Sequence, residues 1–99
     1  MEFPDIDETI KRIQSHRGVQ GVIIATKDGF PIRTTMDNTS TVLFIANMMT
    51  LEERAASMVR DIEPSNALLF MRIRSRKFEI MASAEDDYIV IVIQNPNES

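Results

Sequence analysis

Cysteine is absent from this sequence of 99 residues, and glycine and histidine are scarce, with three copies and one copy. The lack of cysteine excludes disulfide bonds, thiol nucleophiles and cysteine metal sites. The glycines do not show the spacing of a phosphate-binding loop or a dinucleotide fingerprint, so we expect no cofactor. No apolar run approaches the roughly 20 residues of a membrane-spanning helix, and the acidic N-terminus does not resemble a signal or transit peptide. These absences predict a cytoplasmic protein.

Candidate catalytic groups are equally few. His16 could serve as a general base, but a lone histidine near the end of a predicted helix more often compensates the helix dipole. The acidic run at residues 85–87 lacks the spacing of a calcium-binding loop, and such a run in a hairpin turn is usually solvated. A nucleophile, a base and an orienting group do not occur together, so the sequence predicts no enzymatic activity and no metal site.

Charge narrows the choice of partner. The formal net charge is −4, from 11 basic and 15 acidic side chains, which argues against binding to nucleic acid and against attraction to anionic membranes. A local basic patch nevertheless lies on and after a predicted strand, and it contains Arg72, Arg74, Arg76 and Lys77. Arg72 and Arg74 alternate onto one side of that strand, so the patch is either a solvated strand face or a surface for an acidic partner.

Hydrophobic periodicity predicts two helices and five strands. Three isoleucines at helical spacing form one stripe of a short amphipathic helix, from about Asp5 to His16. A long helix follows a run of N-cap candidates and stops before Pro64, covering about Ser40–Ile62. Apolar runs between turn residues predict strands at Val19–Thr26, Phe30–Met36, Asn66–Arg74, Phe78–Ala84 and Tyr88–Gln94.

The strand order can be argued from turn length and burial. Short turns pair the first strand with the second, the third with the fourth, and the fourth with the fifth. The apolar runs Val22–Ala25 and Tyr88–Ile93 need cover on both faces, so the first and fifth strands should meet in the middle. The resulting order is 2-1-5-4-3, in a single α/β (α+β) domain over residues 1–99. The long helix would cross one face of the sheet, and the short N-terminal helix would cover the other.

The long helix carries more apolar residues than one sheet contact requires. One stripe contains Phe44, Met48, Leu51, Ala55, Met58 and Ile62, and a second group, roughly opposite, contains Val42, Ile45, Met49 and Ala56. A helix needs one apolar stripe to dock on a sheet, so the second group requires cover of its own. A neighbouring loop could supply that cover. The alternative, which we favour, is a helix–helix contact in a dimer.

The edges of the predicted sheet favour the same dimer. Pro31 lacks an N–H and blunts the second strand, whereas the third strand has no proline and several large apolar residues. Such an open edge invites pairing with another chain, and a two-fold contact through this strand and the long helix would cover both. The predicted dimer interface consists of Val42, Ile45, Met49, Ala56, Leu68, Phe70 and Arg72.

Several segments match one protein family in the same order along the chain. They are Arg17–Ile24, Asp28–Ile32, Thr35–Asn38, Val59–Pro64, Arg72–Lys77, Glu79–Met81 and Ile91–Pro96. Together they make the sequence similar to the roadblock family of dynein light chains over nearly its whole length. The resemblance implies a five-stranded antiparallel sheet with helices on both faces. It also implies a homodimer with a continuous ten-stranded sheet, built from the helix around Val42–Val59 and the strand Leu68–Ile73.

The resemblance also implies a function, that of a non-catalytic light chain of a dynein motor. Such a dimer binds the dynein intermediate chain and supports motor assembly and cargo attachment on microtubules, in the cytoplasm or in a cilium. The resemblance also implies that the chain can form a heterodimer with a sister light chain. We expect the intermediate chain on the sheet face that the long helix leaves uncovered. The alternative is a roadblock-type scaffold or regulator of a small GTPase, because related folds act on GTPases.

Overall fold

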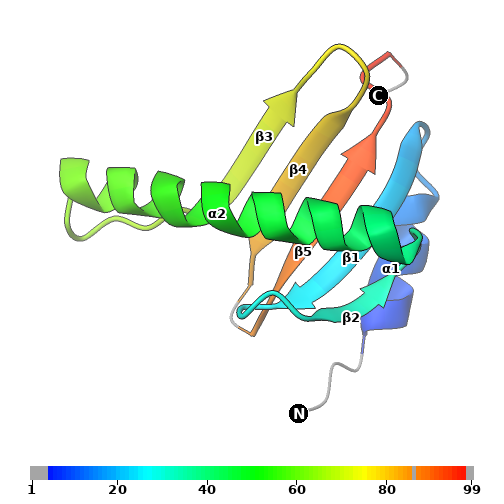
Figure 1. The fold of residues 1–99 in the computed structure, drawn as a ribbon, viewed down its shortest axis with the longest axis horizontal. Helices are drawn as coiled ribbons and strands as arrows, with labels where there is room; N and C mark the ends of the chain where they lie inside the picture. The colour runs from blue at the N-terminus through cyan, green and yellow to red at the C-terminus, as the bar shows by residue number, and fades with distance from the viewer. Residues whose placement is uncertain (1–4, 86, 98–99) are drawn as a thin grey trace.

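The computed structural model describes residues 5–85 and 87–97, so the predicted acidic turn is described only at Glu85 and Asp87. In chain order the elements are α1 (Ile6–Gln14), β1 (Val19–Thr26), β2 (Pro31–Thr34), α2 (Asn38–Ile62), β3 (Phe70–Arg74), β4 (Glu79–Ala84) and β5 (Tyr88–Gln94). The strands form one antiparallel sheet in the order β2-β1-β5-β4-β3 (Figure 1). The predicted strand order is therefore confirmed.

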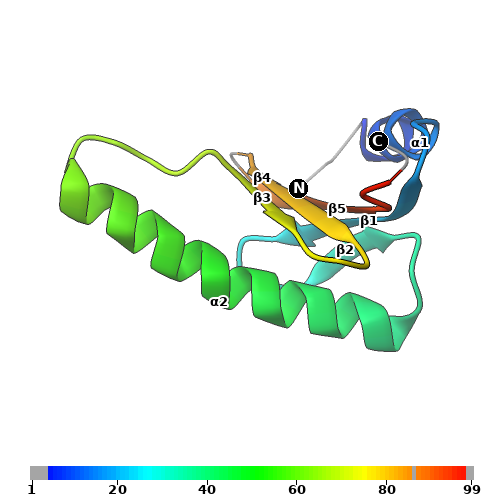
Figure 2. The ribbon, with the colours of Figure 1, turned by 90° about the horizontal axis from the view of Figure 1, so that it is seen from above.

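The two helices lie on opposite faces of the sheet (Figure 2). Successive residues of a strand point to opposite faces, so β1 and β5 each contribute to two separate apolar clusters. The cluster under α2 contains Ile23, Ala25, Ile45, Met48, Ala82, Ile89, Ile91 and Ile93. The cluster under α1 contains Ile6, Val22, Ile24 and Val90. The larger cluster identifies the α2 face as the main core.

Three strands are shorter than predicted, and the smallest change is in β4, which begins at Glu79 instead of Phe78. β3 begins at Phe70 instead of Asn66, because the preceding chain turns and the Asn66 amide donates to the Glu63 carbonyl at 2.9 Å. Leu68, which was predicted to lie in this strand, therefore lies in the segment that connects α2 to β3. β2 covers only Pro31–Thr34.

α2 faces the sheet along a line that the sequence analysis did not identify. Thr41, Ile45 and Met48, at spacings of four and three residues, are buried. Ile45 is only 5% exposed, so the prediction that it lies on a second, outward-facing stripe is wrong. The two predicted groups flank this line on either side, and they form one broad face instead of two opposite stripes. Val42, by contrast, is 63% exposed.

α2 is longer than the sheet is wide. Its 25 residues extend for about 37 Å at 1.5 Å per residue, whereas five strands cover about 19 Å. The C-terminal half of the helix therefore projects beyond β3 (Figure 1), and we call residues 51–62 the α2 overhang. Leu51, Met58 and Ile62 on the overhang are exposed, Ile62 at 77%. Within the described ranges, no helix combines the length and the hydrophobicity needed to span a bilayer.

The turn between β1 and β2 depends on Gly29, whose φ of 94° lies in the left-handed region. Replacement of Gly29 by alanine should lower the free energy of unfolding by about 1–2 kcal/mol, because an L side chain is disfavoured there. Urea denaturation measures this loss. Steric crowding is not the cause of this loss of stability, because an added Cβ would lie 3.6 Å from Ile45 Cγ2, which is an ordinary van der Waals distance. Gly29→Asn should lose less, because asparagine tolerates this conformation, and equal losses would contradict the conformational explanation.

Candidate interaction surfaces

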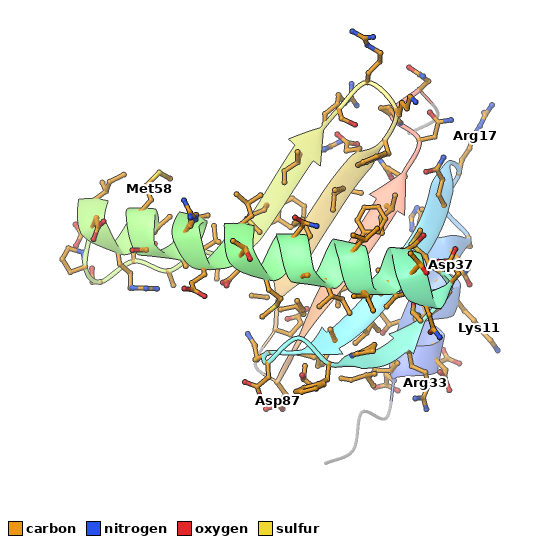
Figure 3. The ribbon with its side chains drawn as sticks, viewed as in Figure 1. Lys11, Arg17, Arg33, Asp37, Met58 and Asp87 are labelled. Atoms are coloured by element: carbon orange, nitrogen blue, oxygen red, sulfur yellow. The ribbon has the colours of Figure 1, made fainter. Side chains whose placement is uncertain are left out.

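One apolar surface lies where β3 meets the α2 overhang. β3 is an end strand, so its outer backbone groups pair with no other strand of the described sheet. Exposed apolar residues gather on this edge and on the helix beside it, and we call them the edge surface: Leu51, Met58, Ile62, Leu69 and Phe70. Figure 3 shows Met58 on the part of α2 that extends past the sheet. Exposed apolar groups of this size usually mark a contact with another molecule.

The structure separates the predicted interface residues into two places. Val42, Ile45 and Met49 lie near the β1–β2 turn, where they line a hollow together with Gly29. Leu68 and Phe70 lie at the other edge of the sheet and line a different hollow with Met48 and Glu52. Their membership of a dimer interface stays a prediction, as does that of Ala56, which is half-buried, and of Arg72, which is exposed.

Sequence analysis assigned Met58 and Ile62 to the sheet-facing stripe, and the structure places both on the overhang. The signal that could have located them is the length of the helix. A predicted helix of about 22 residues already exceeds the width of five strands by about 14 Å, so its last turns have no strand of their own chain beneath them.

A second surface lies on the opposite face of the sheet, beside α1. α1 packs mainly against β1, at one side of that face (Figure 2). Next to α1, this face has two adjoining hollows of about 470 and 200 Å³. Both hollows are lined by Ile13, Met81 and Val92. We call them together the α1-face groove. Val92 is only half-buried, so the expectation that β5 is covered along both faces is wrong at this position.

A buried carboxylate orders one end of this face. Glu79 is 1% exposed, and its Oε2 accepts hydrogen bonds from Arg72 Nε at 2.8 Å and from Arg74 Nε at 3.1 Å. Its Oε1 accepts from Arg72 Nη2 at 3.0 Å and from Gln94 Nε2 at 2.8 Å. The register causes this cluster, because Glu79 lies between Arg74 on β3 and Gln94 on β5. The basic patch is thus partly an internal ion-pair network.

The hydrogen bonds from Arg72 lower the pKa of the Glu79 carboxyl from 4.5 to about 2, with help from Gln94 and Arg74 and against the effect of burial. A carboxyl whose pKa is lower in the folded chain than in the unfolded chain stabilises the fold at pH values above the unfolded-state pKa. This stabilisation builds up between the two pKa values, where the unfolded chain binds more protons than the folded chain. That stabilisation is complete above about pH 4.5 and disappears as the pH falls towards 2. The arginines and Gln94 are therefore held most firmly near neutral pH.

Glu79→Gln should lower the stability of the protein at pH 7, because it removes the charge that the two guanidiniums share. It should also remove part of the stability loss that the wild-type protein shows between pH 4.5 and about 2. Urea midpoints of both proteins at several pH values measure the difference. Glu53→Gln on α2, where the carboxylate is exposed, is the matched control. Parallel curves for wild type and Glu79→Gln would contradict the assigned role of Glu79.

Several cationic or titratable side chains border the α1-face groove from its α1 side. α1 ends at Gln14, so His16 lies beyond the helix and lines the groove with Arg17. Arg12, in the last turn of α1, lines the neighbouring hollow. The predicted helix, which ended at His16, therefore extended two residues too far. Across residues 5–85 and 87–97, no group of three or more histidine, cysteine, aspartate or glutamate side chains is arranged to hold a metal ion.

The fold and these surfaces define a class of small sheet-and-helix domain with one open sheet edge and one open sheet face. The model of the Roadblock/LC7 domain family matches residues 5–95 of this chain. This chain belongs to the Roadblock/LC7 domain family.

Solved structures share this fold at low sequence identity. A Roadblock/LC7 domain from Streptomyces avermitilis has a TM-score of 0.84 and 12% identity, over 96% of this chain and 82% of that chain. MglB of Myxococcus xanthus has a TM-score of 0.81 and 15% identity, over 100% of this chain and 82% of that chain. A further MglB structure, described as a tetrameric arrangement, has a TM-score of 0.73 and 6% identity, over 99% and 78%. At these identities the likeness establishes the fold.

Proposed function

We propose that this chain is a non-catalytic scaffold or regulator of a small GTPase and that it acts in the cytoplasm. The observation that carries the proposal is the Roadblock/LC7 match over residues 5–95, joined to the likeness to MglB over the whole chain. Roadblock-type folds scaffold or regulate GTPases, and two of the similar structures come from the bacteria Streptomyces avermitilis and Myxococcus xanthus. These comparisons do not support a dynein subunit, an intermediate-chain partner or a microtubule location. The GTPase alternative therefore replaces the first prediction.

The working unit in this proposal is a dimer. The open edge of β3 and the exposed residues of the α2 overhang support it, because both need cover. Pairing of β3 with the β3 of a second copy about a two-fold axis would lay each overhang across the sheet of its partner. One similar MglB structure is described as a tetrameric arrangement, which is consistent with self-association in this fold.

The test is a titration of the purified chain against a panel of small GTPases, each loaded with GDP or with a non-hydrolysable GTP analogue. A dynein intermediate-chain peptide is titrated in parallel, and light scattering gives the mass of every species. We expect a dimer of twice 11.3 kDa that binds at least one GTPase with an affinity that depends on the nucleotide. Binding of the peptide with no binding of any GTPase would reverse the proposal in favour of a dynein light chain.

A further inference from the structure

The start of the α2 overhang carries two acidic side chains that have no counter-charge. Glu52 and Glu53 lie where α2 leaves the sheet, and neither forms an ion pair with another described residue. We propose that they bind the basic turn between β3 and β4 of a second copy of this chain. Two-fold symmetry makes two such contacts in each dimer. This inference rests on the proposed dimer and adds the charged side chains by which one copy selects another.

The basic turn, residues 75–77, is the part of the basic patch that lacks a carboxylate of its own chain. Arg76 and Lys77 are exposed, and neither forms an ion pair with the described residues, whereas the two arginines of β3 are bound to Glu79. The backbone of the turn is closed by the Ser75 N–H, which donates to the Phe78 carbonyl at 2.9 Å. A turn that is already ordered loses less conformational entropy when it binds.

The pairing of β3 with its own copy brings the opposite charges together. β3 runs from Phe70 to Arg74, so a two-fold axis that pairs the whole strand passes beside Arg72 and places Arg74 of the second copy opposite Phe70. The basic turn of the second copy then continues past Leu69. α2 crosses β3 near this start of the strand (Figure 1), and Glu52 lines the hollow there with Leu69 and Phe70.

Both carboxylates lie on the side of α2 from which that turn would approach. Glu52 continues the sheet-facing line four residues after Met48, and it is half-buried. Glu53 lies one helical turn after Met49, which lines the hollow beside the β1–β2 turn. Phe78 and the basic turn of the same chain lie on the other side of α2. Antiparallel pairing reverses β3, so the basic turn of the second copy arrives on the Glu53 side.

The surroundings of Glu52 favour an incoming cation. Glu85 and Asp87, the described acids of the β4–β5 turn, are exposed, and this turn leads into Ile89, which lines the same hollow as Glu52. Arg54 is the cation nearest to Glu52 along the helix, but it lies 200° round the helix axis and points away from the sheet. The basic turn of a second copy would therefore meet uncompensated negative charge.

The test reverses each side of the contact in a separate chain. Glu52→Lys/Glu53→Lys and Arg76→Glu/Lys77→Glu should each raise the dissociation constant of the dimer at least about tenfold, because like charges then face each other. An equal mixture of the two variants should dimerise as tightly as wild type within about threefold, since both contacts regain opposite charges. Light scattering over a dilution series measures each constant. Added salt should weaken the wild-type dimer.

Arg12→Glu/Arg17→Glu on the α1 side is the matched control, because it reverses two exposed cations away from the β3 edge. This variant should dimerise like wild type and should not rescue Glu52→Lys/Glu53→Lys. Circular dichroism verifies that every variant is folded. A wild-type dimer whose two reversed variants stay dimeric, or fail to dimerise when mixed, would overturn this contact and leave the proposed dimer standing. A wild-type chain that is monomeric at every concentration would overturn the dimer and this contact together.

Discussion

Replacement of Ile91 by alanine should lower the free energy of unfolding by about 2–5 kcal/mol. Ile91 is completely buried on the α2 face of β5, between Ile23 of β1 and Ala82 of β4. The truncated side chain would leave a cavity in the main core, and the sheet on either side cannot collapse to fill it. A domain of this size has only about 5–15 kcal/mol of stability, so a large part would be lost. Urea denaturation at fixed protein concentration measures the change.

Val92→Ala is the matched control for this prediction. Val92 is the next residue of the same strand, but its side chain points into the α1-face groove and is half-buried. Its truncation should lower the free energy of unfolding by only about 1 kcal/mol or less. Similar losses for the two variants would mean that the α1 face is as closely packed as the α2 face, in contradiction to the open groove.

Met58→Asp should weaken self-association at least thirtyfold. Met58 is 56% exposed on the α2 overhang, so the monomer tolerates a charge there. In the proposed dimer the overhang lies against the partner, where an unpaired carboxylate would be desolvated at a cost of about 2 kcal/mol or more. Light scattering over a dilution series measures the dissociation constant, and circular dichroism verifies that the helix is intact.

Ser57→Asp is the control for Met58→Asp. Ser57 is the adjacent residue of the same helical turn and is exposed, and aspartate there has the same unfavourable interaction with the helix dipole. It should leave the dissociation constant within about twofold of wild type. If Met58→Asp remained as fully dimeric as Ser57→Asp at low micromolar concentration, the overhang would not be part of the interface.

The strand order could be predicted because it depends on local features of the sequence. Val22–Ala25 and Tyr88–Ile93 are apolar on both faces, and short turns leave few alternative pairings. The face that α2 turns to the sheet could not be predicted in the same way. Thr41 lies on that line, buried, with its hydroxyl 2.9 Å from that of Thr34. A pattern of apolar residues does not include such a polar position.

The site was harder to predict than the fold because it depends on the alignment of strands. The sequence shows Arg72 and Arg74 as a basic patch, but it does not indicate that Glu79 lies beside them. The network forms only when the register places Glu79 between Arg74 and Gln94, which are distant from one another in sequence. The open groove has a similar origin, since the sequence specifies the apolar stripe of α1 but not its position over β1.

The division of α2 into a supported half and an overhang has a consequence for local opening. Residues around Ile45 and Met48 are anchored in the core, whereas those around Met58 and Ile62 are held in an isolated chain by little beyond the backbone hydrogen bonds of the helix. Short helical segments without tertiary contacts open readily in water. Amide hydrogen exchange should therefore accelerate along α2 from its middle towards Ile62 in dilute protein. A bound second copy would slow exchange at the far end and leave the anchored half unchanged.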